Sequence, residues 1–394
     1  MQRGTIIQHR KSWTLLYYDT VYRDGKPKRV RVRKKLASVS KEYPTKRSVR
    51  PLADDLLSPV NQFQLTPESS FRITDFIDKH YFPAVEQTLR PSTVLNYKVS
   101  IYKKHLKSKL GTIRLRDFRT VNGQRLMRDI SGVEHNTMLK IKNFLSGVFR
   151  FAKQQGYLEG QNPMTDVSVP GRRVKFKGAA YTIEDTENMI ETIEWYGRLE
   201  SVANDAIEDT TDVLALLSFT GLRQSEARGL RWSDWDEKEQ TLTVQRGVWR
   251  THVGPTKTVE SEGTIPVLPL LQSLFENRKA RVKPQPSDYI FAGSRRGSPL
   301  DLHNMENRII RPALKTKPIK WSGFHGFRRG LSTNLFALGV NPKIIAAILR
   351  HAGMAMTLKH YTMIPDDEQR AALAKLEYKI NNRPSGVIVN GVPT

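Results

Sequence analysis

The sequence predicts a multidomain protein that is mainly α-helical and carries small β elements. At 394 residues the chain exceeds the size of one ordinary domain, and two or three domains are expected. Long stretches place apolar residues at the spacing of amphipathic helices, whereas the N-terminal stretch alternates basic and apolar residues as strands do. A hydrophobic fraction of 38% is enough for packed cores, which excludes a disordered basic chain.

The charge balance predicts an anionic partner. Lys and Arg number 64 against 39 Asp and Glu, which leaves a formal net charge of +25 and favours nucleic acid or an anionic membrane. The longest apolar stretch, residues 213–219, is too short to span a bilayer, and the N-terminus lacks a secretory signal, so we expect a cytoplasmic protein that binds nucleic acid. There is no cysteine, which excludes disulfides, thiolate nucleophiles and cysteine-based zinc sites.

The first predicted unit, residues 1–62, is a small basic β module followed by a helix. Residues 12–18 are β-branched and aromatic and predict one strand, and residues 28–35 alternate basic and apolar side chains and predict a second. Because neighbouring side chains of a strand point to opposite faces, the basic ones gather on one face, where they bind phosphates or remain solvated. They include Arg29, Arg31 and Arg33. A helix over residues 45–57 is expected to couple this module to the next unit.

The second predicted unit, residues 67–170, is an all-helical domain that grips DNA. Apolar residues recur at helical spacing after Phe71, Pro91 and His135, which predicts amphipathic helices that begin near these residues. The aromatic stripes are interpreted as core rather than as platforms for stacking bases, because such stripes are usually buried. Basic side chains between them are the candidate DNA contacts. They are Lys98, Lys103 and Lys104.

A basic linker near residues 167–180 leads to the third predicted unit, residues 178–382, which is mainly helical with a strand pair near residues 241–266. A C-terminal tail, residues 383–394, follows. Its apolar stretch, residues 387–389, is interpreted either as a strand added to a neighbouring protomer or as a flexible terminus. The candidate chemistry lies in the third unit, since the second carries no cluster of catalytic side-chain types.

Two motifs of the third unit place an arginine beside another polar side chain. Arg223 and Glu226 are three residues apart in G-L-R-Q-S-E, so that on a helix the acid can hold the guanidinium. His325 and Arg328 form an H-x-x-R motif, whose spacing places both side chains on one helical face. An ordinary surface ion pair and a chance match are the plain alternatives, and each motif is a weak signal by itself.

Three further residues gain meaning only from their positions. Lys257 lies near the tip of an expected hairpin, where a lysine is usually solvated but can also reach a bound substrate. Asn341 and Pro342 predict the start of a helix that leads to His351, whose plain interpretation is a helix-terminal cation. Tyr361 follows ten residues after His351, and a half-buried aromatic is its plain alternative.

These residue types suit chemistry on a phosphodiester. Two guanidiniums can hold the non-bridging oxygens of a phosphate and offset the negative charge that repels a nucleophile. A tyrosine hydroxyl has a free pKa of about 10, so it needs cationic neighbours or a histidine base to lose its proton. An alkoxide oxygen that leaves phosphorus is a poor leaving group and needs an acid.

The order of the motifs resembles the catalytic signature of the tyrosine recombinases, the phage integrase family. G-L-R-x-x-E, a hairpin lysine, H-x-x-R, and L-x-H with a tyrosine ten residues on follow one another between residues 181 and 361. The resemblance makes Arg223 and Arg328 the clamping arginines and Tyr361 the nucleophile. It makes Lys257 the acid, His325 and His351 the two histidines, and Glu226 a supporting acid. It implies neither a metal nor another cofactor. Two residues depart from the pattern: Arg350 replaces the glycine of L-G-H, and Phe327 replaces the leucine of H-x-L-R. We expect Arg350 either to alter the packing of the helix end or to add a phosphate contact.

The resemblance also implies an architecture, an activity and partners. Residues 1–62 would form a three-stranded arm-type DNA-binding module, residues 67–170 a SAM-like core-binding domain, and residues 178–382 a mixed α+β catalytic domain. The expected activity is site-specific cutting and rejoining of DNA through a 3′-phosphotyrosine, which integrates and excises a prophage or another mobile element. The expected assembly is a homotetramer on double-stranded DNA with core and arm-type sites, with an excision factor or a host DNA-bending protein as an optional partner. The alternatives are a catalytically inactive DNA-binding regulator, a type IB topoisomerase and a chromosome-dimer recombinase.

Overall fold

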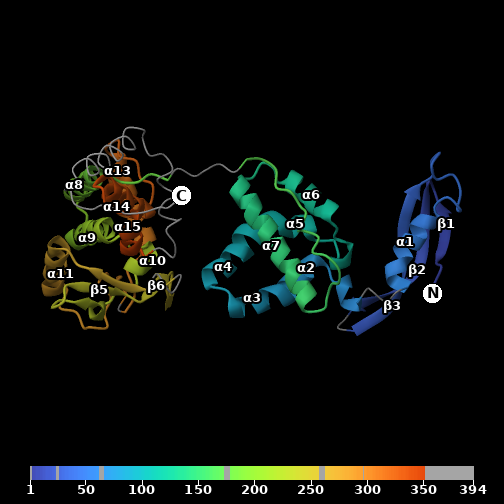
Figure 1. The fold of residues 1–394 in the computed structure, drawn as a ribbon, viewed down its shortest axis with the longest axis horizontal. Coiled ribbons are helices and arrows are strands. Elements are labelled where there is room, and N and C mark those ends of the chain that lie inside the picture. The colour runs from blue at the N-terminus through green and yellow to red at the C-terminus, as the bar shows by residue number, and fades with distance from the viewer. Residues whose placement is uncertain are drawn as a thin grey trace, which may run out of the picture. The chain divides into compact units, whose positions relative to one another are not determined.

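The structure is a computed structural model that describes residues 2–23, 26–61, 66–172, 178–256, 262–295 and 297–350 (Figure 1). Lys257, His351 and Tyr361, and the expected C-terminal tail, lie outside the described residues. The chain divides into two compact units, Met1–Phe176 and Lys177–Thr394. Both are mostly helical with small sheets, as the sequence predicts.

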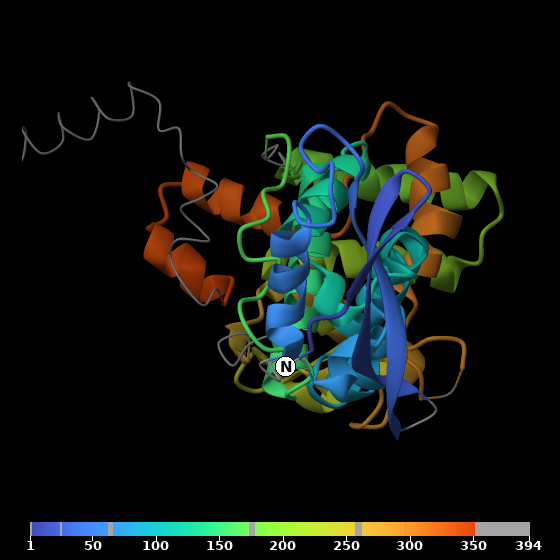
Figure 2. The ribbon, with the colours of Figure 1, turned by 90° about the vertical axis from the view of Figure 1, so that its right-hand side faces the viewer.

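The first unit begins with an antiparallel three-stranded sheet in the order β1-β2-β3. Its strands are β1 (Thr5–His9), β2 (Ser12–Arg23) and β3 (Lys26–Ser38). Figure 2 shows helix α1 (Arg50–Asn61) beside the long ribbon of β2 and β3. Leu15 of β2 and Ala53 and Leu57 of α1 are buried in one small core, so the helix covers the apolar face of the sheet.

The opposite face of β3 is basic. Arg29, Arg31 and Arg33 are exposed, whereas Val30 and Val32 between them are partly buried, so the predicted alternation is present. The guanidinium of Arg29 lies 4.9 Å from the centre of the Tyr18 ring. The side chains of Arg31 and Arg33 make no hydrogen bond or ion pair with the residues that the structure describes. A phosphate contact by this face stays a prediction.

Helix α1 begins at Arg50, five residues later than the predicted start, and it ends at Asn61. Thr45 and Ser48 form a hydrogen-bonded turn instead, in which Ser48 Oγ donates to Thr45 O at 2.7 Å. The backbone N–H of Ser48 also donates to Thr45 Oγ1 at 3.3 Å. Short polar side chains that bond the nearby backbone compete with the helix, and a start at residue 45 was therefore wrong.

A buried ion pair joins the sheet to the helical part of the same unit. The guanidinium of Arg116 donates to both carboxylate oxygens of Asp19 in β2, and the two side chains are 6% and 5% exposed. Beside this pair the Tyr22 N–H donates to Ser70 Oγ at 2.7 Å, and the Tyr22 and Phe71 rings lie 5.0 Å apart. These contacts fix the sheet on the helices through polar groups that are shielded from water.

Replacing Asp19 with alanine should therefore destabilise the first unit strongly. The substitution leaves the Arg116 guanidinium buried without its counter-ion, which costs about 3–5 kcal/mol in comparable cases. Asp54→Ala is the matched control, because Asp54 pairs with Arg50 on the surface, where a salt bridge contributes about 1 kcal/mol or less. Chemical denaturation of the three proteins measures the difference, and equal losses in the two variants would contradict it.

The rest of the first unit is helical. The chain runs through η1 (Pro67–Ser70), α2 (Ile73–Phe76), η2 (Ile77–Tyr81), α3 (Phe82–Thr88), α4 (Pro91–Leu95), η3 (Asn96–Leu106), α5 (Lys107–Leu110), η4 (Leu115–Asp117), α6 (Thr120–Asp129) and α7 (His135–Gln154). Phe76, Phe144 and Phe149 are fully buried in one core, so the interpretation of the aromatic stripes as core is confirmed.

The second unit surrounds one large core with helices and short strands. Its elements are α8 (Ile183–Leu199), α9 (Asn204–Thr220), α10 (Gln224–Ala227), η5 (Trp232–Asp234), β4 (Trp235–Asp236), β5 (Thr241–Val244), β6 (Arg246–Trp249), β7 (His252–Pro255), β8 (Gly263–Pro266), α11 (Pro269–Val282), α12 (Leu302–Met305), η7 (Glu306–Ile310), α13 (Arg311–Lys315), α14 (His325–Ala337) and α15 (Pro342–Ile348). Leu217 of α9, Phe275 of α11 and Phe327 of α14 meet in the core. Phe327, which replaces the leucine of the family motif, is thus a packing residue.

The strands between residues 241 and 266 form two pairings rather than one long hairpin. β5 pairs with β8, and β6 pairs with β7 through a tight turn after Trp249. Arg250 adopts a φ of 53° in this turn. The sequence does not predict the turn, because this conformation favours Gly, Asn or Asp rather than Arg. Gly254 and Pro255, close to the expected hairpin tip at Lys257, therefore belong to a strand, and the expectation of a single hairpin was wrong. Lys257 follows β7.

Among the helices of the described residues, none combines the length and apolarity that a membrane span requires.

Candidate active site

The candidate site is built around the turn that follows α9. The helix ends at Thr220, and Gly221 adopts a left-handed conformation with a φ of 59°. A Cβ atom at Gly221 would lie 2.6 Å from Leu349 Cδ2 and 3.0 Å from Leu331 Cδ2, so only glycine fits. The turn brings the backbone of α9 against α14 and α15, and it presents Arg223 at the start of α10.

Arg223 and Glu226 form the ion pair that their spacing predicts. The Arg223 Nη1 atom donates to Glu226 Oε1 at 2.6 Å, and the Arg223 backbone N–H donates to Oε2 at 3.0 Å. The Glu226 side chain is 2% exposed and that of Arg223 is 22% exposed, so this is not an ordinary surface pair. Burial by itself raises the pKa of Glu226, but the hydrogen bonds and positive charge of Arg223, with the charge of Arg350, lower it below its ordinary value.

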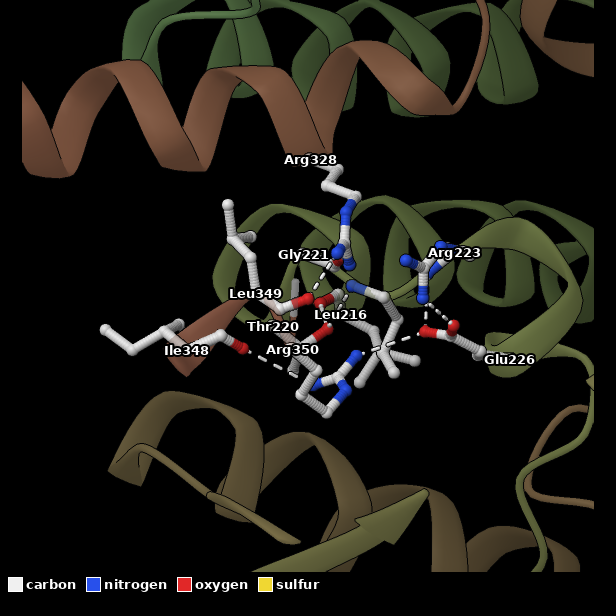
Figure 3. A network of polar contacts seen from close by, with 10 residues as sticks. Leu216, Thr220, Gly221, Arg223, Glu226, Arg328, Ile348, Leu349 and Arg350 are labelled. Carbon is white, nitrogen blue, oxygen red and sulfur yellow. Dashed lines mark hydrogen bonds and ion pairs between the residues drawn. The ribbon is translucent and has the colours of Figure 1, made fainter. Parts of the chain in front are cut away.

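Arg328 on α14 reaches the same turn from a distant part of the sequence. Its Nη1 atom donates to Gly221 O at 2.6 Å, and its Nη2 atom donates to Leu349 O (Figure 3). Burial, then repulsion by Arg223, lower the pKa of Arg328 to about 9, which still leaves the guanidinium protonated at neutral pH. Two arginines predicted from separate motifs thus meet at one buried turn.

A third arginine, which the catalytic pattern does not include, belongs to this cluster. Arg350 is buried, and its Nη2 atom donates to Glu226 Oε2 at 3.1 Å, so one carboxylate joins Arg223 and Arg350 (Figure 3). The sequence identified Arg350 only as a departure from glycine, and two possibilities were a changed helix end or a phosphate contact. Its inward side chain supports the first. Burial lowers the pKa of Arg350, while the charge of Glu226 acts against this shift.

The structure places the remaining predicted site residues as follows. His325 is the first residue of α14 and is exposed, one helical turn before the buried Arg328. The predicted helix start at Asn341 is confirmed, because its side chain accepts the Lys343 N–H at 2.8 Å. The chain reaches position 351 directly from Arg350, so the segment that leads to the predicted nucleophile starts at the arginine cluster. Within the described ranges, no group of three His, Asp or Glu side chains could hold a metal ion.

The candidate DNA contacts of the helical domain differ from one another. Lys103 and Lys104 are exposed on η3 and line a surface recess of about 630 Å³. Lys140 of α7, which the sequence did not single out because it lies far along the chain, lines the same recess. Lys98 is instead paired with Glu86, and its ammonium lies 5.3 Å from the centre of the Phe82 ring. Lys98 is thus already paired with an acid, and phosphate binding by Lys103 and Lys104 stays a prediction.

Two family models match the chain. Residues 187–368 match the phage integrase family, and residues 75–130 match the phage integrase N-terminal SAM-like domain. A tyrosine recombinase XerC-like protein of Caldanaerobacter subterraneus subsp. tengcongensis is 25% identical over 334 residues, which cover 75% of this chain and 81% of that protein. The prophage integrase IntF of Escherichia coli is 28% identical over 203 residues, which cover 50% of this chain and 39% of that protein.

Solved structures have the same fold. The Tn1549 transposon integrase in complex with transposon right end DNA is 20% identical with a TM-score of 0.62, and the match covers 78% of this chain and 100% of that chain. A lambda integrase dimer bound to a core site is 15% identical with a TM-score of 0.58, and the match covers 98% of this chain and 97% of that chain. The family matches agree with the order of motifs and with the clustered arginines. The chain belongs to the phage integrase family of tyrosine recombinases, which break and rejoin DNA strands at specific sites.

Proposed function

We propose that this chain is the recombinase of a mobile element and that Tyr361 attacks a DNA phosphate held by Arg223 and Arg328. The observation that carries the proposal is the buried turn at Gly221, where guanidiniums from two distant motifs meet. The related prophage integrase IntF and the transposase of transposon Tn916 support the mobile-element assignment.

The two arginines would act on the charge of the phosphate. During attack the negative charge on the non-bridging oxygens increases, and fixed guanidiniums stabilise this charge without reorganising. Arg223 is held by Glu226, and Arg328 is held by two backbone carbonyls, so both are oriented before DNA binds. This preorganisation is what an electrostatic catalyst requires.

The remaining predicted residues would move protons. The Tyr361 oxygen forms a bond to phosphorus, and the bond from phosphorus to the 5′ oxygen breaks. A histidine, His325 or His351, would accept the phenol proton, and Lys257 would give a proton to the leaving 5′ oxygen. The 3′-phosphotyrosine keeps the phosphoester bond, so attack by a 5′ hydroxyl rejoins a strand without ATP.

The domain roles and partners of the chain are part of the same proposal. The basic face of β3 would bind arm-type sites, the helical domain would hold the core site, and the second unit would cut it. Relatives of this fold support a DNA partner and a tetramer, since lambda integrase is described as a dimer bound to a core site and as a tetramer bound to a Holliday junction. An excision factor and a DNA-bending host protein remain optional partners.

A nicked core-site duplex tests the proposal. The duplex is taken from the repeats that flank the coding gene. The nick lies close to the cleavage site, so that the short fragment with the free 5′ hydroxyl diffuses away after cleavage. We expect a covalent complex that survives denaturant and carries the 3′ phosphate on a tyrosine. Absence of this complex would favour a DNA-binding regulator. Joining of two separate duplexes, rather than relaxation of a supercoil, separates the recombinase from a topoisomerase.

The arm-binding role of β3 gives a separate prediction. Arg29→Gln, Arg31→Gln and Arg33→Gln together should leave core-site cleavage unchanged but should strongly impair integration that needs arm-type sites, because phosphate contacts are lost. Substitution tests the role more specifically than deletion, because deletion of the module would also leave the buried Arg116 without its partner Asp19. Lys41→Gln, Lys46→Gln and Arg47→Gln remove the same charge from exposed residues outside the sheet and serve as the control. Equal integration by both triple variants would contradict the arm-binding role.

A further inference from the structure

Arg350 adopts a backbone conformation that favours glycine. Its φ of 51° lies in the left-handed region, where the Cβ atom of an L residue crowds the neighbouring carbonyl. Its Nε atom is also buried and has no acceptor among the described residues. Both features cost folding free energy that a glycine would not cost. The stability of the fold therefore does not explain why an arginine occupies this position.

The side chain of Arg350 points inward and contacts three segments. Its Nη2 atom donates to Glu226 Oε2 at 3.1 Å, and its Nη1 atom lies 3.5 Å from Ile348 O in α15. Its Cδ atom is 3.5 Å from where a Cβ on Gly263 would be, at the start of β8. The side chain is 5% exposed. In this position the guanidinium acts on Glu226 and not on a ligand in solvent.

Glu226 is shared by two arginines through different oxygens. Oε1 accepts from the Arg223 guanidinium, and Oε2 accepts from the Arg223 backbone N–H and from Arg350 (Figure 3). With glycine at position 350, the full negative charge of Glu226 would oppose the charges of Arg223 and Arg328. With Arg350 present, three positive charges stand against one negative charge, and two positive charges are left over.

We infer that Arg350 is a positioning residue that neutralises Glu226, so that Arg223 and Arg328 present their full positive charge to the scissile phosphate. The inference rests on the proposed function and deepens it. Attack converts a phosphodiester with one negative charge into a transition state with two. The positive charge that Arg350 adds to the site therefore stabilises the transition state more than it stabilises the bound DNA before attack. Arg350 should therefore raise the rate of cleavage and have little effect on DNA affinity.

Three substitutions at this position separate charge from conformation. Arg350→Gln removes the charge and keeps a long side chain, Arg350→Lys keeps the charge, and Arg350→Gly removes the charge and relieves the backbone. Single-turnover cleavage at saturating core-site DNA should slow by about tenfold or more in the Gln and Gly variants, and Lys should restore most of the rate. The Kd for the core site should stay within about twofold. Lys343→Gln removes an exposed charge from α15 and should cleave normally.

Two outcomes would overturn the inference. If Arg350→Gly cleaves at the wild-type rate, the arginine has no role in catalysis. If Arg350→Lys is as slow as Arg350→Gln, the charge is not what matters. Because Arg350→Gly relieves a strained backbone, it is expected to fold even if the Gln variant is unstable, and thermal unfolding checks both. Wild-type protein that fails to form the covalent complex refutes the proposed function instead, which keeps the two failures apart.

A double-mutant cycle and a neutral substrate give independent readouts. In a Glu226→Gln background there is no carboxylate to neutralise, so Arg350→Gln should cost much less than in the wild type. A methylphosphonate at the scissile position removes the charge of the phosphate, and the deficit of the Gln variant should shrink on it. An undiminished deficit in both experiments would show that Arg350 acts only through packing.

Discussion

Tyr361→Phe is expected to reduce covalent attachment to DNA below detection while the Kd for the core site stays unchanged. The substitution removes only the hydroxyl oxygen that forms the bond to phosphorus, and no phenyl ring can replace it as a nucleophile. The measurement is the trapping of protein on the nicked core-site duplex, with a gel-shift titration for binding. The effect should be the largest of any single substitution in the chain.

Tyr196→Phe is the matched control for this experiment. Tyr196 lies on α8 of the same unit and is partly buried against its core, so the substitution makes the same chemical change away from the arginines. It should form the covalent complex at the wild-type rate. Normal trapping by the Tyr361→Phe protein would remove Tyr361 from its proposed role and direct attention to another hydroxyl of the second unit.

Arg328→Ala is expected to slow single-turnover cleavage by about a hundredfold to a thousandfold. Loss of one preorganised donor to a developing oxyanion raises a barrier by roughly 2.7–4 kcal/mol. The variant also loses the bonds that hold Gly221 O and Leu349 O, so misplacement of both neighbouring segments adds to the effect. Arg328→Lys should rescue little, because one ammonium cannot hold two divergent carbonyls and a phosphate.

The neighbouring arginine provides the control for charge. Arg329 is on the same helix, but its Nε atom donates to Ala179 O at 2.8 Å, away from the cluster. Arg329→Ala should therefore cleave within a few-fold of wild type. Since Arg328 is buried, thermal unfolding must show that its variant is folded. Arg223 is more exposed, so the cleavage rate of Arg223→Ala tests the same pair of arginines with less risk of unfolding. A rate above a tenth of wild type for Arg328→Ala would argue against the clamp.

The sequence predicted those parts of the site that depend on short spacings. Arg223 and Glu226 are three residues apart, and the structure contains their ion pair, but Arg223 is the extended N-cap residue of α10, so a capping box rather than one helical face brings them together. The order of motifs also identified Arg328, although nothing in its own segment indicates the Gly221 carbonyl to which it bonds. The resemblance in motif order predicted family membership, and the recurring spacing of apolar residues predicted the mainly helical fold.

The parts that were missed depend on long-range packing or on unusual backbone geometry. The pairing of Arg350 with Glu226 joins residues far apart in the chain, and a departure from glycine does not reveal where the new side chain points. Arg250 forms a tight turn in a conformation that its residue type rarely adopts. The start of α1 depended on whether Thr45 and Ser48 would bond to each other or continue a helix. Local propensity does not decide such competitions.

The Arg328 guanidinium, which we propose as a phosphate ligand, also anchors the polypeptide through its bond to the Leu349 carbonyl. Any pull that DNA exerts on this guanidinium is transmitted to the peptide two residues before His351. Under that proposal, binding of the phosphate and the position of the Leu349 peptide would be mechanically linked. A guanidinium drawn toward a phosphodiester would change how the end of α15 packs on α14, so the strength of substrate binding would be registered inside the protein core.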